Sequence, residues 1–208
     1  MKRPLLIESQ ILPPVVVIYK MTIHNDVVIE AHENYQKRSF RNRIYLSGHQ
    51  GMSHFTIPLS KGKHEKQHIQ DVTIAYEENW IDQLERVLKT CYSSAPFYIY
   101  YIQDILDIFK TKPTHLFDLN ESLLEWVIDV LKLEITTTPS PSYGSGTNME
   151  DVRAHYLPKT RTASYPIVKY RQVYEDKNGF IPNLSILDMM MCCGPEIPLY
   201  FTDKNQKL

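Results

Sequence analysis

The sequence has few glycines, almost no net charge and no long hydrophobic run, and each shortage excludes a class of protein. With 7 glycines in 208 residues, it contains neither G-x-x-x-x-G-K-[ST] nor G-x-G-x-x-G, the loops that cradle phosphates in many nucleotide-binding proteins. A formal net charge of −1 argues against a protein that coats nucleic acid by bulk charge. The longest apolar run, Phe97 to Ile102, is far below the roughly 18 residues of a membrane span.

Cysteine and the amino terminus indicate the compartment. The three cysteines are an odd number, and Cys192 and Cys193 are adjacent, an arrangement that rarely forms a disulfide. Glu8 and Gln10 interrupt the apolar start, which excludes a signal peptide. We therefore expect reduced thiols and a cytoplasmic protein.

The hydrophobic pattern predicts an α/β fold in one domain, residues 1–208. Short strand-like stretches fill the first third, at 5–9, 27–30, 43–47, 54–59 and 69–76. Residues 14–24 are ambiguous, because the run of valines favours a strand whereas Pro14 and the 3.6-residue spacing of apolar positions favour a helix. We expect a mixed sheet from this N-terminal third, covered by helices.

The helices are expected between residues 79 and 133 and at 185–193. Apolar stripes indicate three helices in the first of these ranges, and the second begins with the capping box Ser185-Ile186-Leu187-Asp188. Residues 136–150 have no apolar period, which predicts a flexible loop or a lid.

One motif suggests a metal site that its surroundings contradict. Residues 64–68 read H-E-x-x-H, the zinc-protease signature, in which two imidazoles lie one turn apart on a helix. A polar turn precedes this motif and a strand-like alternation follows it, so the sequence around it does not favour a helix. We therefore expect no metal site, and the sequence identifies no cofactor.

The segment 35–43 is the most informative part of the chain. Four cations lie within seven residues of it: Lys37, Arg38, Arg41 and Arg43. Two acids precede the segment, Glu30 and Glu33, near the end of a predicted strand. Cations beside carboxylates at the end of an α/β sheet are suited to a small phosphorylated or carboxylated ligand, although a solvated charged turn has the same pattern.

A second basic segment, 153–171, supports a different function. Its arginines and lysines alternate with Tyr156, Tyr165 and Tyr170. Such a pattern can bind single-stranded nucleic acid by stacking, a sugar nucleotide, or nothing, if the tyrosines pack beneath a loop. A non-catalytic binding or assembly protein is therefore the alternative to an enzyme, although nucleic acid is not the expected partner.

Taken in order along the chain, these segments resemble the WbqC-like protein family. Residues 35–43, Tyr-Gln-Lys-Arg-Ser-Phe-Arg-Asn-Arg, are similar to the Q-Y-x-K-R-x-W-x-N-R signature of that family. Phe55-Thr56-Ile57-Pro58-Leu59 is similar to its L-T-I/V-P-V, and residues 179–188 with Gly194-Pro195-Glu196 also match. The resemblance favours a helix at 14–24 in a parallel β-α-β start.

The resemblance implies a bacterial transferase, linked in relatives to O-antigen or other surface-polysaccharide synthesis, with aminoacyl or glycine transfer as a suggested activity. In this sequence the catalytic candidates are Glu33 and His54, either of which can act as a base. The candidates for substrate binding are polar or cationic side chains around the basic segment: Gln10, Tyr35, Lys37, Arg38, Ser39, Arg41, Asn42 and Arg43.

Overall fold

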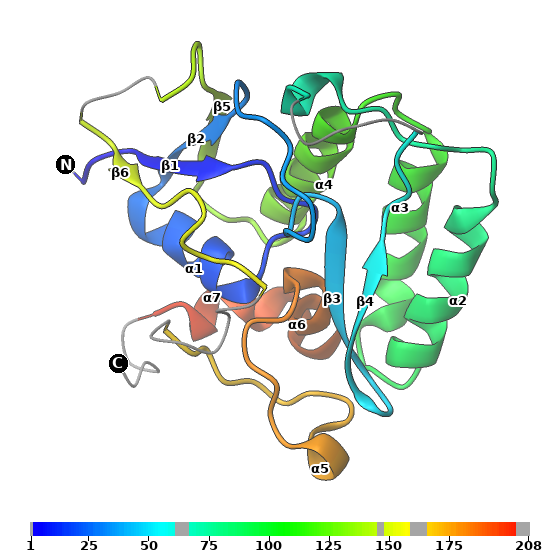
Figure 1. The fold of residues 1–208 in the computed structure, drawn as a ribbon. Helices are drawn as coiled ribbons and strands as arrows, with labels where there is room; N and C mark the ends of the chain where they lie inside the picture. Colours follow the sequence, from blue (N-terminus) through cyan, green and yellow to red (C-terminus); the bar gives the residue numbers. More distant parts are fainter. Residues whose placement is uncertain (1, 61–66, 145–147, 159–165, 203–208) are drawn as a thin grey trace.

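A computed structural model describes residues 2–60, 67–144, 148–158 and 166–202 of the chain (Figure 1). A β-α-β unit opens the fold: strand β1 (Leu5–Glu8), helix α1 (Val15–His24) and strand β2 (Asp26–Glu30). Both strands belong to a parallel sheet with the order β5-β2-β1-β6. Glu8 is the register partner of Glu30, so the two strands end side by side, and we call this end of the sheet its carboxyl edge.

The segment 15–24 forms a helix although valine and isoleucine favour strands. Parallel neighbours need a crossover connection, and α1 is the crossover between β1 and β2. Pro14 precedes the first helical residue, where its missing N–H costs nothing. Residues 15–19 and Met21 are buried, so burial of apolar surface outweighs the strand propensity of this segment. The prediction of a helix at 14–24 is confirmed.

The other two strands of the parallel sheet come from the predicted loop, which is a correction. Strand β5 (Thr136–Pro139) pairs with β2, and strand β6 (Glu150–Asp151) pairs with β1. Residues 136–139 are mostly exposed and have no apolar alternation, because β5 lies at the edge of the sheet. The pattern of burial that reveals a strand in a sequence is therefore missing here. Residues 145–147, in the middle of the predicted loop, lie outside the described residues.

The strands β3 (Arg43–Gly48) and β4 (Gly51–Thr56) form a separate antiparallel hairpin. The expected strand at 54–59 thus begins and ends three residues earlier. The expected strand at 69–76 is wrong, since a 3-10 helix, η2 (Ile69–Asp71), is followed by isolated bridges from Ile74 to Leu59 and from Thr73 to His115.

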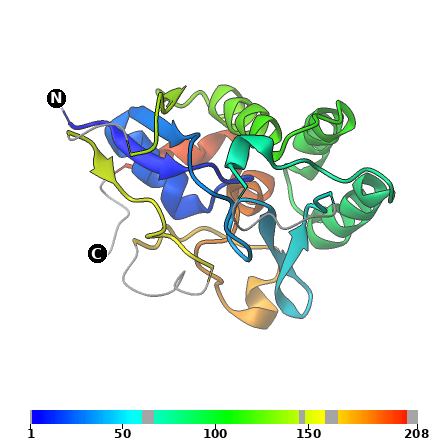
Figure 2. The same cartoon turned by 45° about the horizontal axis from the view of Figure 1, so that its top comes forward.

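Three helices pack side by side: α2 (Trp80–Tyr92), α3 (Tyr98–Lys110) and α4 (Leu116–Val130). Helix α3 lies between the other two, and α2 is in contact with β3 of the hairpin (Figure 2). Helix α6 (Ile186–Cys193) contacts α1, α3 and β3, and thus joins the two halves through one continuous core. Short helices α5 (Glu175–Asn178), η3 (Gly194–Glu196) and α7 (Ile197–Tyr200) complete the fold.

The α/β class and the helices predicted after residue 79 are confirmed. At the start of α6, the Ser185 hydroxyl accepts a hydrogen bond from the backbone N–H of Leu187, as a capping serine does. Among the described residues, no helix is long and apolar enough to cross a membrane.

Candidate functional site

Three buried carboxylates meet at the carboxyl edge of the parallel sheet. Glu8 ends β1, Glu30 ends β2, and Glu33 follows three residues later, with exposed fractions of 2%, 0% and 6%. We call them the carboxylate cluster. The register pairing of Glu8 with Glu30 brings the first two together. Ligands of open α/β sheets commonly bind at the carboxyl ends of the strands, so this edge is where a site is expected.

Glu30 is held in its charged form by hydrogen bonds. Burial alone would raise its pKa, but the backbone N–H of Gly144, the Ser140 hydroxyl and the backbone N–H of His32 all donate to its carboxylate. The Arg153 guanidinium adds an ion pair at 2.6 Å. Together these donors outweigh desolvation and lower the pKa of Glu30.

Glu33 forms a two-point ion pair with Arg41. The Nε of Arg41 donates to Oε1 of Glu33 at 2.8 Å, and Nη2 donates to Oε2. Burial nevertheless raises the pKa of Glu33 above its ordinary value against the effect of Arg41, and the charges of Glu8 and Glu30 act in the same direction as burial. Among the described residues, each carboxylate oxygen of Glu33 uses one of its acceptor positions for Arg41 and retains another.

Glutamine and asparagine side chains link the cluster to helix α4. The Gln10 Nε2 donates to Glu8 at 2.8 Å. The Asn120 Nδ2 donates to the hydroxyl of Ser9 and to the backbone oxygen of Arg41, both at 3.0 Å. These bonds fix which end of each amide is nitrogen. Two sets of hydrogen bonds, which meet at the consecutive residues 8–10, therefore connect Glu8 and Gln10 on one side with Asn120 and the Arg41–Glu33 pair on the other, and we call them together the buried network.

Four buried polar atoms around this network have no hydrogen-bond partner among the described residues. They are two acceptors and two donors: Gln10 Oε1, Asn120 Oδ1, Arg41 Nη1 and Arg43 Nε. We call them the open atoms. Buried polar atoms in proteins are nearly always paired, since leaving one unpaired costs about 1–3 kcal/mol. Their concentration along one network indicates a place prepared for a polar ligand.

The predicted basic segment divides between this site and the surface. Tyr35 is buried and donates its hydroxyl to Asn42 Oδ1 at 2.9 Å, while burial raises the pKa of Tyr35. The Ser39 hydroxyl donates to the backbone oxygen of Gln36 and accepts from the backbone N–H of Arg41. Lys37 and Arg38 are exposed. The four predicted cations therefore do not all lie at the buried network.

His54 lies on β4, where its ring stacks on Tyr45 with centroids 5.4 Å apart. Burial lowers the pKa of His54, and the charge of Arg43 lowers it further. Arg43 is the first residue of β3, and its charge opposes the rise in the pKa of Tyr35 as well as lowering that of His54.

In the described part of the second basic segment, the arginines form ion pairs within the protein and the tyrosines are buried. Arg153 pairs with Asp151 and Glu30, and Tyr156 and Tyr170 are buried. These residues therefore offer no stacking surface to single-stranded nucleic acid. Lys159, Arg161 and Tyr165 lie outside the described residues.

Part of the zinc-protease motif also lies outside the described residues, including His64 and Glu65. His68 is exposed next to η2, and its ring lies 6.5 Å from that of His32. Among the residues that the structure describes, no group of three or more histidines, cysteines or carboxylates is arranged to hold a metal ion.

Sequence reasoning missed Glu8 and Asn120, and it also missed the buried acid Asp188. Asp188 on α6 is fully buried and accepts hydrogen bonds from the hydroxyls of Tyr92 and Tyr170, each at 2.7 Å. Gln172 donates to the same carboxylate at 3.2 Å. An acid at the end of the first strand of a β-α-β unit is a signal that could have identified Glu8. Asn120 comes from a helix 110 residues further on, and nothing local marks it.

Comparisons with known proteins identify one relationship. No curated protein and no solved structure matches the chain. A family model does match, over residues 9–165 and 159–199, and these matches contain the basic segment, the end of β2 and α4. The chain belongs to the WbqC-like protein family.

Proposed function

We propose that this protein is a transferase that binds a small substrate with a phosphate or carboxyl group at the carboxyl edge of the parallel sheet. The observation that carries the proposal is the set of four open atoms beside three buried carboxylates. A structural network would satisfy its own polar groups, because each unpaired group weakens the fold. A binding site leaves such groups for its ligand to satisfy.

The open atoms specify a ligand with both donors and acceptors. Gln10 Oε1 and Asn120 Oδ1 accept hydrogen bonds, so they suit an ammonium or hydroxyl group. Arg41 Nη1 and Arg43 Nε donate, so they suit a carboxylate, a phosphate or a polarised carbonyl oxygen. An aminoacyl group, with an ammonium beside a carbonyl, carries both kinds of group.

Aminoacyl transfer, with glycine the smallest case, is the finer form of the proposal. The acceptor amine or hydroxyl attacks the carbonyl carbon of an activated aminoacyl donor, forming a C–N or C–O bond as the bond to the leaving group breaks. The acceptor's proton passes to a free position on the Glu33 carboxylate, whose raised pKa makes it a better base. The arginine donors stabilise the negative charge that develops on the carbonyl oxygen. The family resemblance supports surface-polysaccharide precursors as the acceptors.

Thermal unfolding in the presence of small ligands tests the binding chemistry. We expect glycine to raise the melting temperature, while acetate, which lacks the ammonium, and methylamine, which lacks the carboxylate, have much smaller effects. A ligand at 100 times its dissociation constant adds about 2.7 kcal/mol of stability, which a melting curve detects easily. Phosphorylated sugars and nucleotide sugars belong in the same screen as acceptor candidates.

The variant Asn120→Leu supplies the matched test of the site. It removes one of the open atoms that accept hydrogen bonds. The rise in melting temperature caused by glycine should disappear, while the rise caused by an acceptor substrate that binds elsewhere is retained. Ser122→Ala on the exposed side of the same helix is the control and should bind glycine normally. The proposal is wrong if no carboxylate or phosphate stabilises the protein, or if both variants respond alike.

A further inference from the structure

The strand β4 has an unpaired edge. In the hairpin, the backbone N–H of Ile57 donates to the oxygen of Asn42 at 2.9 Å, which marks these two as a hydrogen-bonded pair. Such pairs alternate in an antiparallel ladder, so Phe55 and Ser53 also point their backbone groups toward β3. The backbone N–H and C=O groups of Met52, His54 and Thr56 therefore point away from the hairpin, and all three residues are exposed.

Nothing in β4 protects this edge. Proteins usually block an open edge with proline, lysine, an inward charge or a bulge. Residues 51–56 contain no proline, lysine or carboxylate, and their register with β3 is continuous. Within the described part of the chain, the hairpin has no third strand. An exposed edge of this kind is a template for another strand.

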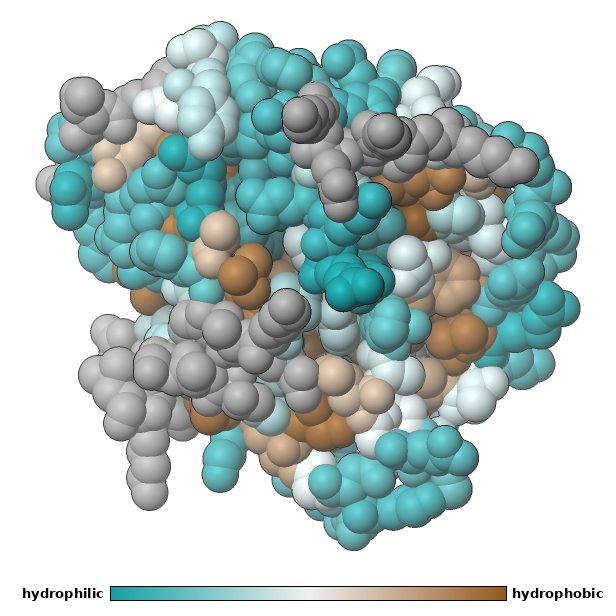
Figure 3. Space-filling model, viewed as in Figure 1, coloured by the Kyte–Doolittle hydropathy of each residue, from teal (hydrophilic) through white to brown (hydrophobic). Residues whose placement is uncertain are grey.

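Two cavities lie along the open edge, one near the hairpin turn beside helix α2 and one past the end of β4. The first has a volume of 610 Å³ and is lined by Met52, Ser53 and His54 on one side and by Arg86, Val87 and Cys91 of α2 on the other. The second has a volume of 440 Å³. We call these two cavities and the open edge between them the β4–α2 groove. Hydrophobic atoms are visible between the hairpin and α2 in the space-filling view (Figure 3).

The chain already pairs with this edge just beyond β4. Ala75 N donates to the oxygen of Pro58, and Ser60 N donates to the oxygen of Thr73, both at 3.0 Å. The segment 73–75 therefore runs antiparallel to residues 58–60 and then turns away into α2. A strand placed beside Met52 to Thr56 would continue the line of this segment in the same direction.

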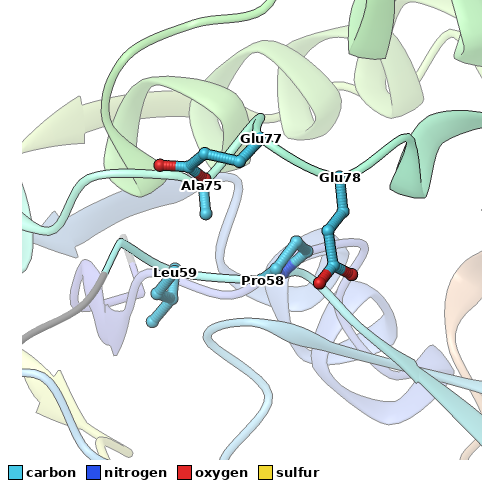
Figure 4. Close-up of a pocket in the computed structure, with 5 residues that line it drawn as sticks. All are labelled: Pro58, Leu59, Ala75, Glu77 and Glu78. Atoms are coloured by element: carbon cyan, nitrogen blue, oxygen red, sulfur yellow. The ribbon is translucent and has the colours of Figure 1, made fainter.

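The two ends of the groove carry opposite charges. Arg86 lines the hairpin end, where Lys177 also lies with its Nζ 2.9 Å from His49 Nε2. Glu77 and Glu78 line the other end, on the segment that faces Pro58 and Leu59 (Figure 4). A strand running antiparallel to β4 would start at the glutamates and finish at Arg86. Its charge complement is a basic residue first and an acidic residue last.

We propose that the β4–α2 groove binds an extended segment of a partner protein, which adds to β4 as an antiparallel strand. The segment would be about seven residues long: five beside residues 52–56, at roughly 3.4 Å per residue, and one more at each end to reach the charged side chains. Its main chain would pair with the outward groups of Met52, His54 and Thr56, as in other cases of strand addition.

Fluorescence anisotropy with a designed peptide tests the proposal. The probe is a labelled heptapeptide with lysine first, glutamate last, and alternating valine and threonine between them. We expect saturable binding, and weaker binding by about tenfold, which is about 1.4 kcal/mol, when lysine and glutamate exchange places, because each end of the peptide then meets a like charge. Two further peptides carry N-methyl groups on one or the other set of alternate amides, and only one of the two should lose binding.

Matched variants place the peptide in the groove. His54→Pro removes an outward N–H without touching the ladder to β3 and should abolish binding, whereas His54→Ala keeps that N–H and should bind. Arg86→Glu should weaken binding and restore it for the charge-exchanged peptide, while Lys89→Glu on the same helix is the control. Circular dichroism checks that each variant is folded.

Three outcomes would overturn the proposal. The first is that the designed peptide and its charge-exchanged form both fail to bind. The second is equal binding by the two N-methylated peptides, which would show that no main-chain ladder forms. The third is a dimer in sedimentation experiments that His54→Pro converts to a monomer, which would assign the edge to a second copy of the chain.

Discussion

Two buried acidic networks in this protein differ in how completely they are satisfied. Around Asp188, two tyrosine hydroxyls and the Gln172 amide donate to one carboxylate, and the hydroxyl of Tyr92 itself accepts from the backbone N–H of Ser47 at 3.1 Å. The carboxylate cluster at the sheet edge also has internal hydrogen bonds, yet open atoms remain beside it. Burial alone therefore does not distinguish a structural acid from a functional one.

The difference follows from where each network lies. Asp188 sits where α6 packs between α2 and the segment after residue 166, and its partners come from elements that it holds together. The carboxylate cluster sits at the end of parallel strands, where the chain changes direction and side chains from β1, β2 and α4 meet. A closed network stabilises the fold. An open network leaves polar atoms unpaired, which lowers stability but keeps those atoms available to a ligand.

Breaking the closed network should have the largest effect on stability. Asp188→Ala leaves two buried tyrosine hydroxyls without their acceptor, and we expect a loss of about 3–5 kcal/mol in the free energy of unfolding. Urea denaturation at neutral pH measures it. Asp188→Asn keeps one acceptor oxygen and should lose less. A loss below about 1 kcal/mol for the alanine variant would show that this network is not structural.

Removing one donor from the same carboxylate should cost less. Tyr170→Phe deletes a hydroxyl that donates to Asp188 at 2.7 Å, and we expect a loss of about 1.5–3 kcal/mol, the range for hydrogen bonds to charged groups. The measurement is again urea denaturation, with Tyr174→Phe as the control, because the Tyr174 hydroxyl donates to a backbone oxygen near the surface. Equal losses in both variants would remove the distinction between a closed network and an ordinary surface contact.

The sequence predicted the open site in part. Strand ends, the basic segment and Glu33 were all identified, because hydrophobic periodicity and local clusters of charge are visible in consecutive residues. The sequence could not show that the four cations separate in the fold, with Lys37 and Arg38 exposed and Arg41 buried. Arg38 adopts a left-handed backbone with φ of 59°, in a turn that leaves it exposed, whereas Arg41 turns inward to Glu33.

The remaining parts depend on contacts between distant residues. Asn120 reaches Ser9 across 111 positions, and Asp188 reaches Tyr92 across 96, so neither contact has a local pattern. Strands β5 and β6 were missed because they are short, largely exposed edges of the sheet, whose pairing with β2 and β1 is decided by backbone hydrogen bonds rather than by side chains.

A further acid, Glu121, makes the free energy of unfolding of this protein depend on pH. It follows Asn120 on α4, and burial, with the charges of Glu125 and Asp118, raises its pKa to about 7. A raised pKa in the folded state means that its contribution to stability is complete below about pH 4.5 and is lost as the pH rises through 7. Glu121→Gln should therefore be more stable than the parent protein by about 1–2 kcal/mol at pH 8, after allowance for partial exposure, and equal to it at pH 4.5.

Urea denaturation at the two pH values measures this difference. Asp129→Asn is the control, because Asp129 is exposed on the same helix and is not among the charges that raise the pKa of Glu121. A stability gain that is the same at both pH values would assign the effect to helix propensity rather than to ionisation.

The open network should respond least in stability and most in binding. Gln10→Met removes the hydrogen bond from Nε2 to Glu8, which costs about 1 kcal/mol, but it also removes the buried Oε1 that has no partner among the described residues. The two effects nearly cancel, so the free energy of unfolding should change by less than about 1 kcal/mol. The rise in melting temperature caused by glycine should nevertheless disappear, because one of its two acceptors is gone. A loss of stability as large as that of Asp188→Ala, with glycine binding retained, would place Gln10 in a structural network and end the contrast between the two.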